Sequence, residues 1–304
     1  MMRRTIFDED HKLYRSAVRE FIAAEITPHH DTWEAAGVVS RDAWLAAGAS
    51  GHLCHSVAEE YGGAGVADFR FPVVLMEEMA HSLASGPGFA VHSEMVVPYL
   101  QEHGSDEQKE RWLAGCVDGS LITAVAMSEP GTGSDLAGIA TRAERDGDSY
   151  LLNGAKTFIS NGQLADLVVV VARTAEDPHR GLTLLVVERG MAGFERGKNL
   201  DKVGMKAQDT SELFFTDVRV PVENRIGDEG AGFFYLMSGL ERERMSIAVG
   251  AVAAAEKAFH LTKEYVAERH AFGRPISKFQ NTRFWLAEMA TEVQIAQVFV
   301  DRCT

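Results

Sequence analysis

Hydrophobic residues along the chain follow three successive patterns, and the first is helical. Over residues 5–113, apolar side chains recur three or four positions apart, which is the spacing of one helix face. Residues 71–81 keep such a face throughout. Ser105 followed by Gln108 is typical of a capping box, so a helix is expected to begin there. The first stretch is therefore predicted to be a helical domain.

The second pattern, over the middle of the chain, is that of β-strands. Residues 167–171 and 182–187 are runs of leucine and β-branched residues bounded by polar turn residues. The pairs Asp146-Gly147 and Asn153-Gly154 predict hairpin turns, because both readily adopt the positive φ angles of such turns. No long helical period separates the strands, so antiparallel pairing in a barrel or a sandwich is expected.

The third pattern begins at Gly230, where the helical period returns. Residues 233–268 and 279–304 predict two long helices, and the turn-forming sequence Phe272-Gly273-Arg274-Pro275 separates them. The second helix is still in register at the last residue. The predicted fold class is α+β with three domains: an N-terminal all-α domain (residues 1–120), a middle antiparallel β-barrel or sandwich (121–229), and the first half of a C-terminal helical bundle (230–304).

Composition and charge are those of a globular protein. The 304 residues are 46% hydrophobic and 24% charged, and the formal net charge is −14. A large core is therefore expected, whereas a nucleic-acid partner is not. No apolar run approaches the ~20 residues of a membrane span, so none is expected. Cys54, Cys116 and Cys303 lack metal-binding or disulfide spacing, which favours a cytoplasmic protein without a metal site.

A loop of small residues carries the first candidate chemistry. Residues 126–138, Ala-Met-Ser-Glu-Pro-Gly-Thr-Gly-Ser-Asp-Leu-Ala-Gly, read as a strand end followed by a glycine-rich loop. Glycines let backbone N–H groups approach a ligand closely, and Thr132 and Ser134 add hydroxyl donors. A phosphate or the edge of a flavin would fit such a loop, and an ordinary structural turn is the alternative.

The second candidate is a carboxylate, Glu243, on the predicted helix 233–268. Five apolar or small residues are expected on its side of that helix: Leu236, Leu240, Ile247, Gly250 and Ala254. Burial among them would raise the pKa of the carboxyl and suit it to general-base catalysis. The alternatives are a structural ion pair or plain solvation, although adjacent Arg244 points ~100° away and is a poor partner within the helix.

The run 126–138 resembles the first signature of the acyl-CoA dehydrogenase family. Four further segments resemble that family in the same order: residues 59–63, 156–162, 218–223 and 268–273. The resemblance covers the whole chain and implies a helical domain, a middle β domain and a C-terminal helical bundle. It also implies FAD as cofactor and a homotetramer or homodimer. Relatives continue for about another half-bundle beyond Thr304, so only the first half of the bundle is expected here.

The resemblance also assigns roles to individual residues. Met127 and Ser128 would touch the flavin ring, Phe158 would pack on it, and Ser134 would lie by the pyrophosphate and the thioester. For Phe158 and Ile159, ordinary strand core is the alternative. The cofactor-binding residues implied in this way, of which the last three would reach the FAD of a neighbouring subunit, are Met127, Ser128, Gly133, Ser134, Phe158, Ile159, Ser160, Arg269, Phe272 and Gln280.

The implied reaction is α,β-dehydrogenation of an acyl-CoA thioester to the trans-2-enoyl-CoA. A base removes the α-proton, a hydride passes to flavin N5, and electrons pass on to electron-transferring flavoprotein. Glu243 resembles the base of long-chain and isovaleryl members, whereas most other members carry their base beyond Thr304. Ser134, Glu241 and Arg244 are the expected substrate-binding residues. Residues 82–100 would line an apolar acyl pocket.

Two other functions remain open at this point. An acyl-CoA oxidase, with oxygen as electron acceptor, would share the flavin motifs. A flavin-containing member of the fold without catalysis, acting as a DNA-binding protein or a scaffold, is the second alternative. The formal charge of −14 argues against DNA binding, and the presence of a candidate base argues against a scaffold.

Overall fold

The structure is a computed structural model that describes residues 3–304. Contacts divide it into two compact units. The helical unit comprises the described residues up to Ala24, together with Asp68–Ala84 and Arg244–Thr304. The sheet unit comprises Glu25–Ala67 and Ser85–Glu243. Each unit combines segments distant in sequence, and the domain boundaries after residues 120 and 229 stay a prediction.

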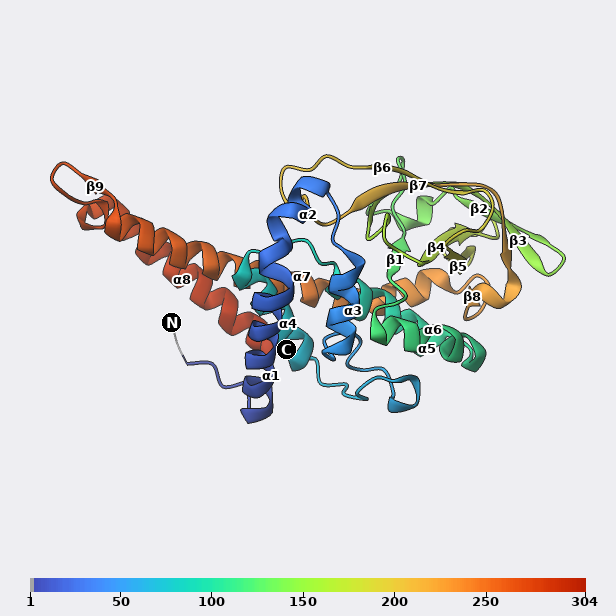
Figure 1. The fold of residues 1–304 in the computed structure, drawn as a ribbon. Coiled ribbons are helices and arrows are strands. Elements are labelled where there is room, and N and C mark those ends of the chain that lie inside the picture. The colour runs from blue at the N-terminus through green and yellow to red at the C-terminus, as the bar shows by residue number, and fades with distance from the viewer. Residues whose placement is uncertain (1–2) are drawn as a thin grey trace. The chain divides into compact units, whose positions relative to one another are not determined.

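The helical unit consists mainly of long helices (Figure 1). Its elements are α1 (Glu9–Phe21), α4 (Arg70–Ser82), α7 (Gly232–Glu268) from Arg244 onward, the hairpin of β9 (His270–Ala271) and β10 (Arg274–Pro275), η7 (Ile276–Lys278) and α8 (Gln280–Cys303). The two long helices predicted for the end of the chain are thus confirmed. The turn between them is confirmed as well, with φ angles of 53° at Phe272 and 76° at Gly273.

Ion pairs hold α4 to α1 within this unit. The carboxylates of Glu77 and Glu78 are almost fully buried. Arg15 lies 2.7 Å from Glu77, and Arg19 lies 2.7 Å from Glu78. Because a buried carboxylate without a partner is costly, these arginines fix which face of α1 meets α4.

The sheet unit contains shorter helices. The α-helices are α2 (His30–Ala36), α3 (Arg41–Ala49), α5 (Val97–His103) and α6 (Asp106–Asp118). The single-turn elements of the chain before α7 are η1 (Ile22–Ile26), η2 (Thr27–His29), η3 (Glu59–Tyr61), η4 (Val91–Val96), η5 (Leu136–Gly138) and η6 (Val222–Asn224). The capping box at the start of α6 is confirmed, since Ser105 and Gln108 bond reciprocally. The Gln108 amide also donates to the carbonyls of Glu223 and Arg225, which docks α6 on the end of the sheet.

An eight-stranded sheet forms the centre of the sheet unit. Its strands are β1 (Thr123–Ala126), β2 (Arg142–Asp146), β3 (Ser149–Ser160), β4 (Leu167–Arg173), β5 (Leu182–Glu188), β6 (Phe194–Asn199), β7 (Thr210–Pro221) and β8 (Arg225–Ile226). The order is β6-β7-β3-β2-β4-β5-β8, with β1 paired to β4. Over the described residues β6 and β8 do not pair with each other, so the sheet is not a closed barrel.

Pairing in the sheet is mostly antiparallel, as expected, but β4 departs from this pattern. β1 and β2 both pair with β4 in parallel. The expectation of purely antiparallel pairing was therefore wrong at this strand. The chain passes from β1 to β4 through a long loop and the β2–β3 hairpin, which is enough chain for the crossover that parallel pairing needs.

Of the predicted turns, one is correct and one is wrong. Asp146 pairs with Ser149 across a turn at Gly147, where φ is 63°. At Asn153-Gly154, by contrast, β3 continues without a turn and only shifts register against β7. A Cβ on Gly154 would lie 2.4 Å from Thr141 Oγ1, so the glycine serves a close approach between strands.

The core of the sheet unit lies against β3, β4 and β7 and includes Tyr150, Leu152, Val168, Val170 and Phe215. Cys54 and Cys116 are buried as free thiols, whereas Cys303 is exposed. Across residues 3–304, no helix has both the length and the apolar character that crossing a membrane requires.

Candidate active site

The glycine-rich loop begins where β1 ends, at Ala126. Glu129 N donates to Thr132 O at 2.8 Å and Thr132 N donates to Glu129 O at 3.1 Å, so the loop folds back on itself. A Cβ built on Gly131 or on Gly133 would meet no heavy atom within 4 Å. Packing within the chain does not require glycine at these two positions, and the exposed backbone there is open to a ligand.

A buried ion pair lies beneath this loop. Lys156 Nζ, on β3, is 2.8 Å from Glu129 Oε1 and donates to the Met127 carbonyl at 3.0 Å. The Glu129 carboxylate also accepts hydrogen bonds from the backbone N–H groups of Ala140 (2.7 Å) and Thr141 (2.9 Å). Burial lowers the pKa of Lys156, while the charge of Lys156 keeps the pKa of Glu129 below its ordinary value against the effect of burial. The pair thereby fixes both ends of the loop to the sheet.

Phe158 has an unusual conformation next to the loop. Its φ is 60°, a left-handed value that is rare for a bulky residue, and its side chain is 69% exposed. The preceding residue, Thr157, donates its N–H to the Ser128 carbonyl at 2.9 Å. A register shift between Lys156 and Ile159 turns the ring out of the sheet. Strain of this kind costs roughly 1–3 kcal/mol and is concentrated at functional sites.

Phe158 and its neighbour Ile159 were each expected either to contact the flavin or to belong to the strand core, and their exposure differs. Strand core is wrong for Phe158, because its ring points to solvent. Ile159 is only 2% exposed and belongs to the core, so a ligand contact at this position falls to its backbone. The hydroxyls of Ser128, Ser134 and Ser160 make no hydrogen bond with any residue that the structure describes. Exposed ring, open backbone and available hydroxyls together suit a flat ligand with a charged tail.

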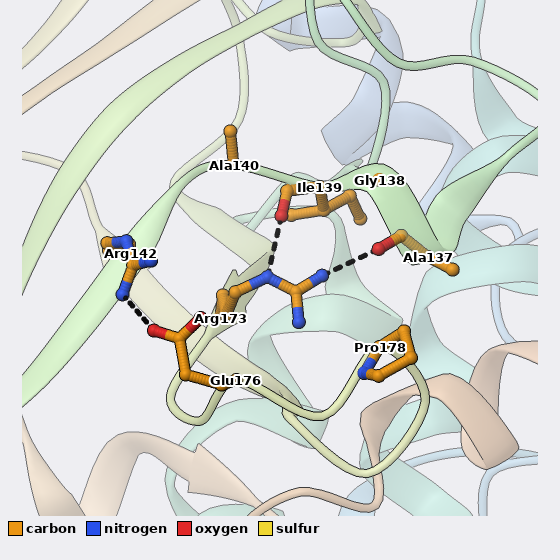
Figure 2. A pocket seen from close by; sticks show the side chains of 8 residues that line it. All are labelled: Ala137, Gly138, Ile139, Ala140, Arg142, Arg173, Glu176 and Pro178. Atoms are coloured by element: carbon orange, nitrogen blue, oxygen red, sulfur yellow. Dashed lines mark hydrogen bonds and ion pairs between the residues drawn. The ribbon is translucent and has the colours of Figure 1, made fainter.

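A shallow hollow of about 350 Å³ lies at the far end of the loop (Figure 2). The residues that line it are Ala137, Gly138, Ile139, Ala140, Arg142, Arg173, Glu176 and Pro178. Figure 2 shows Arg173 reaching across to two backbone carbonyls, at 2.9 Å from Ile139 O and 2.7 Å from Ala137 O. Arg173 thus anchors the end of the loop, as Lys156 anchors its beginning. No residue expected from the sequence to bind cofactor or substrate lines this hollow.

Glu243 lies in the first part of α7, within the sheet unit, and is half-buried. The Tyr99 hydroxyl, on α5, donates a 2.6 Å hydrogen bond to Glu243 Oε1. The apolar side of α7 is buried at Leu236, but Ile247 is 66% exposed. Burial of the carboxylate by its own helix is therefore less complete than the sequence suggests. Its polar partner Tyr99, 144 residues away, leaves no signal in the sequence.

A second cavity, of about 210 Å³, opens beside Tyr99. It is lined by Glu94, Met95, Pro98, Tyr99, Glu102, Ser238, Gly239, Glu241 and Arg242. Burial raises the pKa of Glu94 to about 7, against the opposing charge of Arg242. From residues 82–100, the cavity is lined by one carboxylate, Glu94, together with Met95, Pro98 and Tyr99. The apolar side chains of Phe89 and Val96 are buried in the core instead. That residues 82–100 line an apolar acyl pocket stays a prediction.

The remaining expected residues are exposed. Glu241 lines the second cavity, and Arg244 follows Glu243 along α7. Arg269, Phe272 and Gln280 lie in the helical unit, at the β9–β10 hairpin and the start of α8. Phe272 is 95% exposed. The sequence did not predict the roles of Lys156, Glu129 and Tyr99. Of these three, only Lys156 left a signal in the sequence, because it is a lysine in a strand whose other inward-pointing residues are apolar.

Three models of one protein family match this chain. "Acyl-CoA dehydrogenase, N-terminal domain" matches residues 8–120, the middle domain matches 124–218, and the C-terminal domain matches 230–304. These matches confirm the predicted fold class of a helical part, a β part and a helical part.

Curated relatives agree with the family models. The chain is 46% identical over 303 residues to the mitochondrial long-chain specific acyl-CoA dehydrogenase of Mus musculus, covering 99% of this chain and 70% of the relative. It is 35% identical over 299 residues to the mitochondrial isovaleryl-CoA dehydrogenase of Oryza sativa subsp. japonica, covering 97% of this chain and 73% of the relative.

Solved structures give the same result. An acyl-CoA dehydrogenase from Geobacillus kaustophilus superposes with a TM-score of 0.95 at 51% identity, covering 97% of this chain and 78% of that one. A glutaryl-CoA dehydrogenase from Mycobacterium smegmatis in complex with FADH2 superposes with a TM-score of 0.87 at 28% identity, covering 98% and 75%. The chain therefore belongs to the acyl-CoA dehydrogenase family of oxidoreductases.

Proposed function

We propose that this protein dehydrogenates an acyl-CoA thioester between Cα and Cβ, giving the trans-2-enoyl-CoA, with Glu243 as the base. The hydrogen bond from Tyr99 to Glu243 carries this proposal. The hydrogen bond holds a half-buried carboxylate of α7 through a neutral donor, the Tyr99 hydroxyl. A carboxylate arranged in this way can accept a proton from a weak carbon acid once the thioester carbonyl is polarised.

We also propose FAD as the cofactor. The fit rests on the exposed Phe158 ring, the open backbone at Gly133, and the available hydroxyls of Ser128, Ser134 and Ser160. When bound, FAD supplies the hydride acceptor. Met127 and Ser128 would contact the ring system, with Phe158, the Ile159 backbone and Ser160 beside it, and Gly133 and Ser134 would lie by the pyrophosphate. The complex of the M. smegmatis relative with FADH2 supports FAD as the cofactor.

The residues of this protein would have three roles in the reaction: holding the loop, accepting the proton and positioning the substrate. Lys156 and Glu129 hold the loop so that its backbone N–H groups stay oriented toward the ligand. Glu243 receives the α-proton at one carboxylate oxygen. Ser134, Glu241 and Arg244 would position the thioester and its CoA portion. The proton and the hydride leave adjacent carbons of the acyl group. The rate of the reaction therefore depends on how the acyl group is positioned between the base and the hydride acceptor.

Partners and location form part of the same proposal. Electron-transferring flavoprotein would reoxidise the reduced protein. In a homotetramer or homodimer, the exposed Arg269, Phe272 and Gln280 would reach the FAD of a neighbouring subunit. A cytoplasmic location also remains a proposal, because the relatives named above are mitochondrial.

The decisive experiment is anaerobic reduction of the FAD-loaded protein by saturated acyl-CoA esters of increasing chain length. Glu243→Gln is expected to keep FAD and acyl-CoA binding but to lose flavin bleaching by ~10²-fold or more, the usual scale for loss of a general base. Glu264→Gln, an exposed carboxylate on the same helix, is the matched control and should bleach at the wild-type rate. Wild-type bleaching by Glu243→Gln would show that another group is the base. In a separate aerobic assay, oxygen uptake equal to enoyl-CoA formation would indicate an oxidase instead.

A further inference from the structure

The Tyr99 side chain is buried, and its hydroxyl points away from its own helix, α5, toward Glu243 on α7. The side chain is 3% exposed, yet its hydroxyl is directed at the one carboxylate that the reaction needs. The distance of 2.6 Å between Tyr99 Oη and Glu243 Oε1 is that of a short hydrogen bond to an ionised acceptor. A phenol buried for packing alone would not need this alignment.

Space for the phenol comes from a glycine on the helix of the base. A Cβ on Gly239 would lie 2.7 Å from Tyr99 Oη and 3.2 Å from its Cζ. Gly239 precedes Glu243 by four residues, so the two positions lie on one face of α7, one turn apart. The phenol therefore lies across the face of α7 and reaches the carboxylate one turn further on.

The element that carries Tyr99 is firmly held. Pro98 lies in the first turn of α5, and η4 directly precedes this helix. In η4, the His92 ring accepts a hydrogen bond from Thr123 N at 3.1 Å and contacts the Cys116 carbonyl at 2.9 Å. Thr123 begins β1, the strand that leads into the glycine-rich loop. Tyr99 is thus supported by the same framework as the proposed flavin loop.

We propose that Tyr99 is a positioning residue for the base: its hydroxyl fixes one oxygen of the Glu243 carboxylate and stabilises the ionised form until the α-proton arrives. This inference rests on the proposed function, because it assumes that Glu243 is the base. A hydrogen bond to the charged form of a carboxyl favours that form. Without it, Glu243 would be protonated, and inactive, at a higher pH.

Other charged groups face the same cavity and must be separated from this effect. They are Glu94 from η4, Glu102 from α5, and Glu241 and Arg242 from α7. Burial, the hydrogen bond to Glu243, and the charges of Glu243 and Glu102 all raise the pKa of Tyr99, so its hydroxyl remains a donor throughout the working range. Glu94 is the group whose charge changes near neutral pH. A Glu94→Gln background removes that titration.

The test compares Tyr99→Phe with the parent in the FAD-loaded full chain, with and without Glu94→Gln. Carboxyl-labelled glutamate allows the pKa of Glu243 to be followed by carbon NMR, and its signal is assigned by its loss in Glu243→Gln. We expect Tyr99→Phe to raise that pKa by roughly one unit or more. The acidic limb of the flavin-reduction profile should move by the same amount, with acyl-CoA binding unchanged. Tyr235 lies on the same helix as Glu243, and Tyr235→Phe loses the hydrogen bond that its hydroxyl accepts from Asp228 N, so this variant should change neither quantity.

The outcomes separate the two proposals. If Glu243→Gln is inactive but Tyr99→Phe leaves both the pKa and the profile unchanged, Tyr99 is structural and the inference is overturned while the function stands. If Glu243→Gln bleaches normally, the assignment of the base itself is wrong. Gly239→Ala, which displaces the phenol while keeping both groups, provides the decision if Tyr99→Phe does not fold, and a shift in the same direction is expected.

Discussion

Lys156 and Glu129 form an ion pair, with 2.8 Å between Nζ and Oε1, in which both side chains are almost completely buried. Removal of one partner from such a pair leaves an uncompensated charge and costs about 3–5 kcal/mol. We expect Lys156→Met to lower the free energy of unfolding on that scale. Because Lys156 also holds the Met127 carbonyl, FAD affinity should fall as well. Urea denaturation and flavin fluorescence titration measure the two effects.

The double variant Lys156→Met/Glu129→Met provides the control for this prediction. It removes both charges, so much of the lost stability should return. FAD affinity should not return, because Glu129 also holds Ala140 N and Thr141 N at the other end of the loop. Recovery of both properties together would show that the pair has no part in shaping the loop.

Phe158 provides a second test, because its backbone is strained and its ring is exposed. Phe158→Ala should weaken FAD binding at least ~10-fold if the ring packs on the flavin, with little effect on the flavin-free protein. Phe158→Gly should in addition stabilise the flavin-free protein relative to Phe158→Ala by about 1 kcal/mol, since glycine accepts positive φ without strain. Thermal unfolding of the flavin-free forms measures this difference. Unchanged FAD affinity in both variants would remove Phe158 from the site.

The elements that the sequence predicted correctly are those determined by local periodicity. α7 and α8 follow the helical spacing of apolar residues, and β4 and β5 follow unbroken aliphatic runs. The capping box at Ser105 is confirmed for the same reason, since its partner is three residues away. Local signals of this kind need no knowledge of the rest of the fold.

What the sequence missed depends on contacts between distant segments. Asn153-Gly154 has the composition of a turn, but the glycine is needed because Thr141 passes within reach of its Cβ position. Phe158 lies in an apolar strand pattern, and only a register shift against β7 turns it outward. Tyr99 approaches Glu243 from 144 residues away. No local pattern encodes a partner at that separation.

Because of buried His92, we expect the free energy of unfolding to fall in acid. It is fully buried, and the bond from Thr123 N requires an unprotonated Nδ1. Burial lowers its pKa to about 4, as it does for His52 and His55. Between pH 6.5 and 4 the unfolded chain then binds more protons than the folded one, so stability falls as the pH falls through this window. Each fully buried histidine contributes up to about 3 kcal/mol.

The measurement is urea denaturation of the parent and of His92→Gln at several pH values from 7.5 to 4. The variant should be less stable at pH 7.5, because its hydrogen bonds are imperfect. Its stability should decline less steeply as the pH falls, because the difference in bound protons between the unfolded and the folded chain is smaller by about one. His179→Gln, at an exposed turn, should retain the parent slope. Equal slopes for parent and His92→Gln would mean that His92 is not neutral and buried in solution.

For Glu94 we expect the opposite pH dependence, with its contribution to stability falling as the pH rises. Burial raises its pKa to about 7, above the ordinary value of 4.5, so the folded protein binds the extra proton between these two values. The penalty for ionising this side chain is absent below pH 4.5, grows as the pH rises, and is complete above pH 7. Glu94→Gln should therefore leave stability almost unchanged at pH 4.5 and increase it by up to about 3 kcal/mol at pH 8. Glu102→Gln, on the same cavity but half-exposed, is the matched control and should show a much smaller change. A uniform effect of Glu94→Gln at every pH would show that Glu94 does not titrate in this range, and that burial does not control the charge of the cavity beside Tyr99.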